Sequence, residues 1–168
     1  MDLEELVSDE VVAQLRDGRA DVGVFVQGPD TAGLNTRDFR QDELVLVLPA
    51  GHRLLGKAPL AFVDALDEEW ISLNTGAALL QTQQQAALAA HRTLRLRMQV
   101  RSFNAVCHMV GAGLGIALLP KAACLPMIRA MKLAWRPLAD PWARRTLLVA
   151  TLANASDAAV LALRDFLV

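Results

Sequence analysis

The sequence predicts an α/β fold, on three observations. Apolar runs typical of strands alternate with segments of helical period along the whole chain, an order typical of α/β sheets. Of the 168 residues, 54% are hydrophobic and 21% are charged, so the chain can bury a sizeable core. Aromatic residues make up only 5% and Tyr is absent, which predicts a core of Leu, Val and Ala.

The N-terminal residues predict a strand–helix–strand unit. Leu3–Leu6 resembles the end of a strand, and Ser8 is a good N-cap for a helix that ends at Gly18. Ala20–Val26 is the second strand of the unit. This order is the mark of a parallel sheet.

A near-continuous apolar strand follows at Asp42–Pro49, and we expect it to be buried on both faces. The sequence then predicts a short helix over Ala61–Leu66 and a strand over Trp70–Leu73. The next helix opens at Asn74–Gly76 and runs to about Ala90.

The remaining residues continue the alternation. Leu94–Arg101 alternates apolar and polar residues as a strand does, and Ser102 caps a helix that Gly111 and Gly113 stop. Leu114–Pro120 is a buried strand. The last predicted elements are a helix near Lys121–Ala130, strands near Leu133–Pro137 and at Arg144–Leu152, and a helix capped by Ser156 with Val160, Leu163, Phe166 and Leu167 on its apolar face.

Charge and patterning exclude several classes of function. The net charge of −1 and the pI of about 6.3 argue against a domain that binds nucleic acid by itself. We interpret the arginines at 92, 95, 97 and 101 as a solvated strand face. The uncharged stretch Ser102–Pro120 changes period midway, which favours a buried helix–turn–strand over a membrane span. The N-terminus has no export signal, so we expect a cytoplasmic protein.

No residue pattern points to catalysis, a metal or a cofactor. Cys107 and His108 are adjacent, and neighbouring helix residues point about 100° apart, so they do not form a nucleophile–base pair. His52 and His91 lie in a loop and at a helix end, and no metal-ligand set emerges. The glycines from Gly111 to Gly115 follow a helix, whereas a dinucleotide fingerprint must follow a strand.

Three stretches of the sequence resemble the effector-binding domain of LysR-type transcriptional regulators: Glu4–Val24, Asp42–Leu54 and Val100–Pro120. The third is the most specific, because a polar residue, a helix and a glycine-rich turn lead into a buried strand. The resemblance implies a type II periplasmic-binding-protein-like fold, with two lobes, an effector cleft between them and two crossover strands. Lobe 1 would comprise residues 1–41 and 144–168, and lobe 2 residues 42–143.

This chain departs from the family pattern at its start. The family's effector domain begins with a strand and a helix that precede the segment matching residues 2–5. We expect both to be absent here, together with the winged helix-turn-helix, so that the domain is N-terminally truncated.

The resemblance also implies where an effector binds. Ser8, Thr75 and Ser102 each stand at the start of a predicted helix, where free N–H groups and the helix dipole attract anions. The alternative is that all three act only as N-caps. Phe103 matches a position that contacts the effector in the family, and a core role is the alternative. Val26 ends a strand where some relatives carry a basic residue, which weakens the case for a dicarboxylate effector.

The function that we predict is sensing of a small metabolite, such as a small organic acid, by a regulatory domain that is not an enzyme and has no cofactor. Family members pair side by side, so we expect a homodimer through the helix at Asp9–Asp17, and a higher oligomer in the full-length protein. DNA would be bound only through the missing domain, and no membrane is involved. The alternatives are a solute-binding protein of a transport system with the same fold, an enzyme on this architecture, and an interaction module without a ligand.

Overall fold

Strand β2 (Leu34–Leu48) is the centre of the larger part of the chain. The computed structural model describes residues 2–4, 6, 8–73 and 78–168. The last five residues of β2, 44–48, are all buried. Strands β5 (Ala117–Pro120) and β6 (Ala134–Pro137) both pair with this buried stretch in antiparallel register, and so occupy its two edges.

A parallel pair, β3 (Trp70–Leu73) and β4 (Leu96–Val100), continues the sheet. An isolated parallel bridge between Trp70 and Ile116 joins this pair to β5. The Ile71 N–H donates to the Ile116 carbonyl, and the Ile116 N–H donates to the Glu69 carbonyl, each over 2.8 Å. The strands therefore follow one another as β6, β2, β5, β3 and β4.

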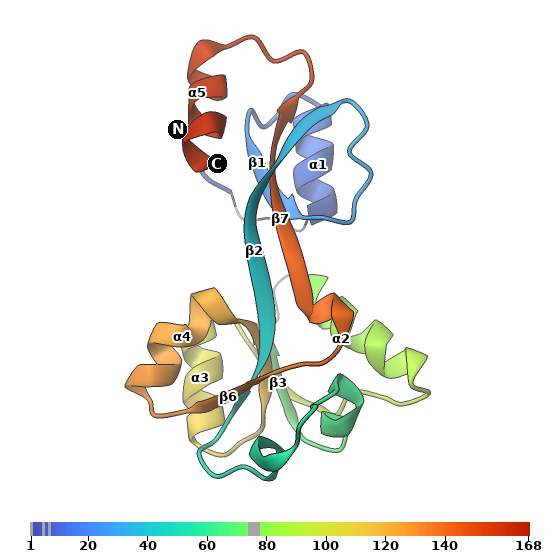
Figure 1. Cartoon of the computed structure of the whole chain (residues 1–168), viewed down its shortest axis with the longest axis vertical. Helices are drawn as coiled ribbons and strands as arrows, with labels where there is room; N and C mark the ends of the chain where they lie inside the picture. The colour runs from blue at the N-terminus through green and yellow to red at the C-terminus, as the bar shows by residue number, and fades with distance from the viewer. Residues whose placement is uncertain (1, 5, 7, 74–77) are drawn as a thin grey trace. The chain divides into compact units, whose positions relative to one another are not determined.

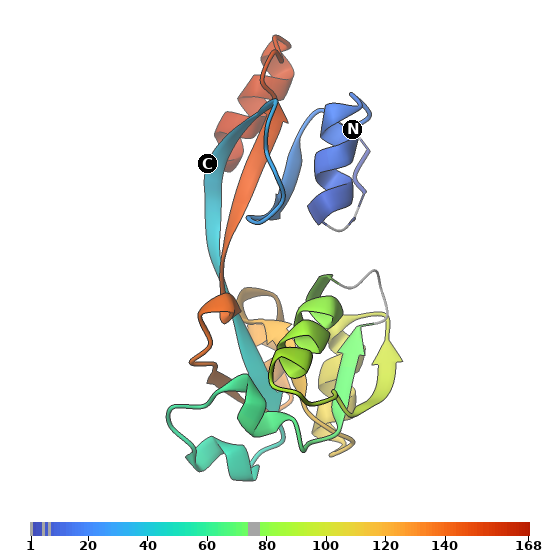
Figure 2. The same cartoon turned by 90° about the vertical axis from the view of Figure 1, so that its right-hand side faces the viewer.

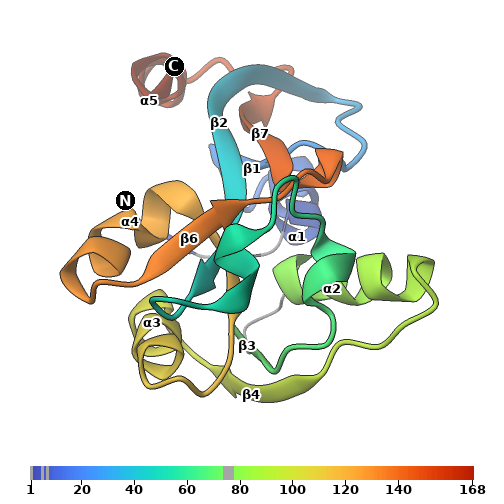
Figure 3. The ribbon, with the colours of Figure 1, turned by 60° about the horizontal axis from the view of Figure 1, so that its bottom comes forward.

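Helices cover both faces of this sheet. Val45, Val47 and Ile71 pack against α3 (Phe103–Gly111) and α4 (Lys121–Ala130). On the opposite face, a core that includes Leu46 and Trp70 packs against α2 (Ala78–Ala89) and three short 3₁₀ turns. Figures 1 and 3 show α3 and α4 on one side of the strands and α2 on the other. The turns are η1 (Arg53–Gly56), η2 (Phe62–Ala65) and η3 (Pro141–Ala143).

The chain divides into two compact units, which we call unit 1 (Met1–Gln41 with Arg145–Val168) and unit 2 (Asp42–Arg144). The polypeptide passes from unit 1 to unit 2 along β2, and back at the start of β7 (Arg144–Leu152). The layers described above belong to unit 2.

Unit 1 has a smaller core. Strand β1 (Gly23–Val26) pairs antiparallel with β7, and α1 (Ser8–Arg16) lies against them through Val12 and Leu15. Helix α5 (Ala158–Leu167) lies on the other side of these strands from α1 (Figures 1 and 2). Gly18, with φ of +66°, ends α1 in the left-handed conformation that glycine favours.

Most predicted elements are confirmed. Strands β3 and β7 and helix α4 have the predicted bounds, and the short helix expected over Ala61–Leu66 is η2. The buried strand predicted at Asp42–Pro49 is part of β2, which begins earlier, at Leu34, in a polar stretch without a burial signal.

Three predictions about unit 1 are wrong. Residues 2–4 and 6 form no strand, and Leu3 is 93% exposed. The sheet of unit 1 is not parallel, because the neighbour of β1 is β7 from the far end of the chain rather than a strand next in sequence. The N-cap of α5 is Asp157 and not Ser156, since the Asp157 carboxylate accepts hydrogen bonds from the N–H groups of residues 159 and 160. The prediction of an apolar face on α5 is not among these, but the structure adds that much of this face is open, with Phe166 85% exposed.

Candidate functional site

Three strands of unit 2 end at one edge of the sheet, which we call the strand-end edge. Because β3 and β4 are parallel and the bridge at Ile116 sets β5 parallel to β3, their last residues, Leu73, Val100 and Pro120, lie at the same edge. A helix follows each strand: α2, α3 and α4. Helix N-termini at the carboxyl ends of parallel strands are a recurrent ligand-binding arrangement in α/β proteins.

Ser102 and Phe103 lie at this edge. The Ser102 hydroxyl accepts a hydrogen bond from the Ala105 N–H over 3.2 Å and caps α3, as predicted. Ser102 is exposed, so the hydroxyl keeps capacity for a further hydrogen bond. The Phe103 side chain is half-buried and packs against the core that includes α3. This favours the alternative that its ring has a core role.

A charged group that the sequence did not reveal lies at the start of α4, at the same edge of the sheet. Lys121, the first residue of α4, contacts the Glu43 carboxylate over 2.8 Å, and its ammonium stands 4.3 Å from the centre of the Trp135 ring. The register of β2 with β5, which sets Leu44 opposite Pro120, brings Glu43 and Lys121 together. They are 78 residues apart, so only the strand pairing reveals the contact.

Ser8 and Val26 are brought together in unit 1. The Val26 N–H donates to the Ser8 hydroxyl over 3.2 Å, which joins the start of α1 to the end of β1. The next residue, Gln27, donates its N–H to the Thr146 carbonyl over 2.8 Å. Thr75, the fifth predicted effector residue, lies outside the described residues.

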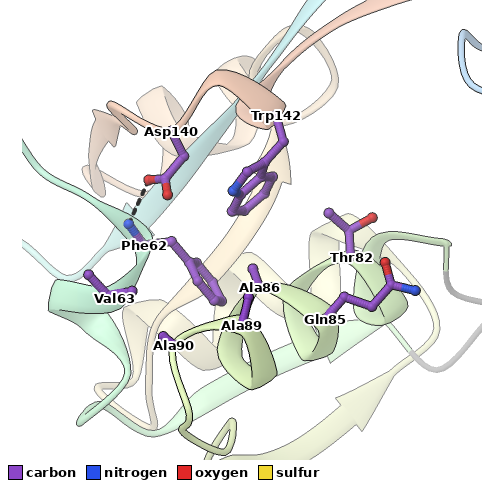
Figure 4. A pocket seen from close by; sticks show the side chains of 9 residues that line it. All are labelled: Phe62, Val63, Thr82, Gln85, Ala86, Ala89, Ala90, Asp140 and Trp142. Carbon is purple, nitrogen blue, oxygen red and sulfur yellow. Dashed lines mark hydrogen bonds between the residues drawn. The ribbon is translucent and has the colours of Figure 1, made fainter.

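A groove of unit 2 of about 520 Å³ lies between η2, η3 and α2. Figure 4 shows the Phe62 and Trp142 rings on one side of it and small alanines of α2 on the other. The two rings meet edge-on with centres 5.4 Å apart, and the Asp140 carboxylate accepts from the Phe62 N–H over 2.7 Å. Of the predicted effector residues that the structure describes, none lines this groove. A smaller hollow of about 150 Å³ lies near His52, Glu68 and Arg97.

The arrangement does not favour nucleophilic or metal chemistry. Cys107 and Cys124 are both buried, and burial raises the pKa of each thiol, that of Cys124 to about 11. Thiols of this kind stay protonated and react slowly. Over residues 8–73 and 78–168, no group of three or more His, Cys, Asp or Glu side chains is placed to hold a metal ion. Within the same ranges, no helix is long and apolar enough to cross a bilayer.

The arginines near β4 are paired within unit 2. Arg92 contacts Asp67, and Arg95 contacts Glu69 over 2.6 Å. Arg97 donates to the Leu114 carbonyl over 3.1 Å. These contacts offset much of the positive charge of this face.

Comparison with protein families gives one match over the whole chain. The model of the LysR substrate binding domain matches residues 1–168. The chain is 29% identical over 113 residues to a probable HTH-type transcriptional regulator, LrrA, of Synechococcus elongatus. It is 28% identical over 120 residues to a probable hydrogen peroxide-inducible genes activator of Mycobacterium avium. The matches span 67% and 69% of this chain, but only 37% and 38% of those proteins.

Solved structures share the fold. The regulatory domain of CcmR from Synechocystis PCC6803, in complex with 2-PG, superposes with a TM-score of 0.80 at 20% identity, over 96% of this chain and 78% of that one. The effector-binding domain of QuiR, in complex with shikimate, superposes with a TM-score of 0.75 at 18% identity, over 96% and 76%. Both have the type II periplasmic-binding-protein-like fold.

Proposed function

Because this chain belongs to the LysR substrate-binding domain family, we propose that it senses a small-molecule effector and passes the change to a DNA-binding domain in a longer protein. The observation that carries the proposal is the family match over residues 1–168. Domains of this family are regulatory and are not enzymes. The transport alternative is not favoured, because the relatives are transcriptional regulators. A cytoplasmic location is part of the proposal, since a regulator must reach DNA.

The effector site that we propose in unit 2 is the strand-end edge at the start of α3. The Ser102 hydroxyl and the N–H groups of the first turn of α3, Phe103 included, can donate to an anionic or polar group, and the helix dipole favours negative charge there. Lys121 adds a positive charge that an effector carboxylate could share with Glu43.

In unit 1, we propose Ser8 and Val26 as effector-binding residues from their positions in the sequence. Their mutual hydrogen bond fixes the start of α1 against the end of β1. The N–H groups of the first turn of α1 would be the donors to a ligand there. Thr75 stays a prediction from the sequence.

The test is a thermal-melt screen of the chain against small hydroxy acids, dicarboxylates, amino acids, aromatic acids and nucleobases at millimolar concentration. A ligand at 100 times its dissociation constant stabilises the folded state by about 2.7 kcal/mol. For a chain of this size, that corresponds to a rise in Tm of about 5–11 °C.

Two substitutions of the same residue separate capping from binding. Ser102→Ala removes the cap and the hydroxyl, and is expected to lower both the stability and the ligand-induced shift. Ser102→Asp keeps a strong N-cap but places a negative charge where an anion would bind, so it should preserve stability and abolish the shift. Ser156→Ala, at an exposed serine of unit 1, is the matched control. A full ligand response in Ser102→Asp would refute the proposed site.

We also propose that the chain forms a homodimer through the outward face of α1. Val12 faces the core of unit 1 and cannot contribute, whereas Ala13 is exposed. Ala13→Glu should therefore shift the sedimenting species from dimer to monomer without unfolding it. Ala153→Glu, at an exposed loop residue, is the control. An Ala13→Glu variant that still sediments as a dimer would count against this interface.

A further inference from the structure

Helix α2 buries one polar side chain among apolar ones. Its buried residues Leu80, Gln83 and Ala87 share one face at helical spacing. Gln83 is 1% exposed, whereas Gln84 and Gln85 face solvent. Within the part of the chain that the structure describes, neither the Nε2 nor the Oε1 atom of Gln83 has a hydrogen-bond partner.

An amide buried without a partner is costly. Transfer of the group from water loses its hydrogen bonds, and no described residue replaces them. Leu or Met would pack at least as well at this position, because each fills a similar volume without the cost of burying an amide. Unpaired buried polar groups are rare in folded proteins, so each one calls for an explanation.

A second buried polar side chain lies on the same layer of unit 2. Along β3, Trp70 and Ser72 point to one face of the sheet and Ile71 to the other. Trp70 belongs to the core that packs against α2, so Ser72, which is 4% exposed, faces α2 as well. Gln83 and Ser72 are thus the two buried polar side chains recorded between the sheet and α2 in the described residues.

The direction of the Gln83 side chain relates it to the proposed effector site. Side chains of a helix lean toward its N-terminus. Helix α2 starts at Ala78, just beyond the strand-end edge, and Gln83 lies between one and two turns into it. Its amide therefore leans toward the edge at which Ser102 caps α3.

We propose that the Gln83 amide, with Ser72 in the same layer of unit 2, recognises an uncharged hydrogen-bonding group of the effector, such as a carboxamide or a hydroxyl. This inference rests on the proposed function. A carboxylate only accepts hydrogen bonds and would leave Oε1 unpaired, whereas a carboxamide or hydroxyl both donates and accepts and can satisfy both amide atoms. The effector class is then a small acid that carries, besides its anionic group, a neutral polar group.

The unpaired amide also gives the ligand a means to shift the conformation. A ligand moves an equilibrium only by its difference in affinity for two states. In the present conformation both amide atoms are occluded, so the side chain must turn to meet a ligand. In the turned conformation the Gln83 amide would form hydrogen bonds with the ligand, whereas in the present conformation it forms none with the described residues. The ligand would therefore favour the turned conformation.

The experiment compares paired probes on the wild-type chain, on Gln83→Met and on Gln84→Met. The probe pairs are asparagine with aspartate, glutamine with glutamate, and malate with succinate, and the measurement is the dissociation constant from ligand-dependent melting. Wild type and Gln84→Met should bind the member with the neutral group about tenfold more tightly, the value of one hydrogen bond. Gln83→Met should bind both members equally, and should melt at or above the wild-type temperature without ligand.

The outcomes separate this inference from the proposed function. If wild type binds a probe and Gln83→Met keeps the same preference, the inference is overturned and the effector site stands. If Gln83→Met lowers the ligand-free Tm by as much as Gln83→Ala, the amide has a partner and the inference is also overturned. If wild type responds to none of these probes or those of the wider screen, both fail. As a check that needs no variant to fold, the side-chain amide resonances of Gln83 in wild type should shift on addition of the preferred probe.

Discussion

Replacement of Gly115 by alanine should disrupt unit 2 more than any other glycine substitution in the 111–115 turn. A Cβ at this position would stand 2.5 Å from the Glu69 carbonyl oxygen and 3.1 Å from its carbon. These are backbone atoms of the segment that leads into β3, so they cannot turn aside as a flexible side chain can.

The size of the effect follows from the contacts that hold β3 to β5. The two backbone hydrogen bonds of the Trp70–Ile116 bridge lie at this point, and each contributes about 1 kcal/mol. Moving the strands apart also disturbs the packing of Trp70 and Ile116, which are at most 1% exposed, and overpacking of this kind costs about 1–3 kcal/mol. We therefore expect Gly115→Ala to lower the free energy of unfolding of unit 2 by about 3–5 kcal/mol.

Tryptophan fluorescence during urea unfolding measures this effect in the right part of the chain. All three tryptophans, at positions 70, 135 and 142, lie in unit 2. The control is Gly111→Ala, inside α3, where the nearest atom to an added Cβ is a Leu133 methyl at 3.5 Å. There alanine should stabilise by up to about 1 kcal/mol, because it favours helix. A Gly115→Ala free energy within about 0.5 kcal/mol of wild type would refute the reasoning.

Three further predictions use the same chain. Asp157→Ala should remove the cap of α5 and cost about 1 kcal/mol by circular dichroism melts, whereas Ser156→Ala should cost almost nothing; equal losses would contradict the assignment. Burial raises the pKa of Cys124 from 9.0 to about 11, so the unfolded chain loses this proton at a lower pH than the folded chain does. The free energy of unfolding should therefore fall as pH rises from 9 to 11. A Cys124→Ala variant whose free energy of unfolding falls equally over this range would rule out this thiol as the cause. Hydrogen bonds from Lys57 and the Ala61 N–H lower the pKa of Asp64 below 3.8. The contribution of Asp64 to the free energy of unfolding is therefore full above pH 3.8, and it is lost as pH falls through the lower pKa of the folded state. Asp64→Asn should remove this part of the acid dependence in urea titrations.

Local patterns predicted the elements of unit 2 well, because each carries a signal within a few residues. The apolar run of β2 is continuous where the strand is buried on both faces. The Ser102 hydroxyl caps α3 by accepting from the N–H of Ala105, only three residues away. The glycines at 111, 113 and 115 mark a turn that needs small residues. Such features depend on contacts that are short in sequence.

Features set by distant partners were missed or mistaken. The antiparallel pairing of β1 depends on β7, more than 100 residues away, so a strand–helix–strand order alone could not reveal it. Asp157 and Ser156 are both good caps by type, and the choice between them depends on where the backbone turns into α5.

The candidate site divides in the same way. Ser8, Val26, Ser102 and Phe103 were candidates from helix starts, a strand end and the family resemblance, and the structure adds what each one touches. The sequence gives no signal for the contact of Lys121 with Glu43 or for the burial of Gln83 and Ser72. A lysine after a strand is common, and nothing in the sequence distinguishes Gln83 from the three other glutamines of α2.

By itself, the sequence determined the fold class, the family and the order of strands and helices, since periodicity and short motifs carry that information. Only the tertiary structure decided which strands pair, which residues of unit 2 meet at the strand-end edge, and that the Gln83 amide is buried without a partner among the described residues. The physical reason is that burial and pairing are properties of contacts between distant segments, and these contacts exist only once the chain has folded.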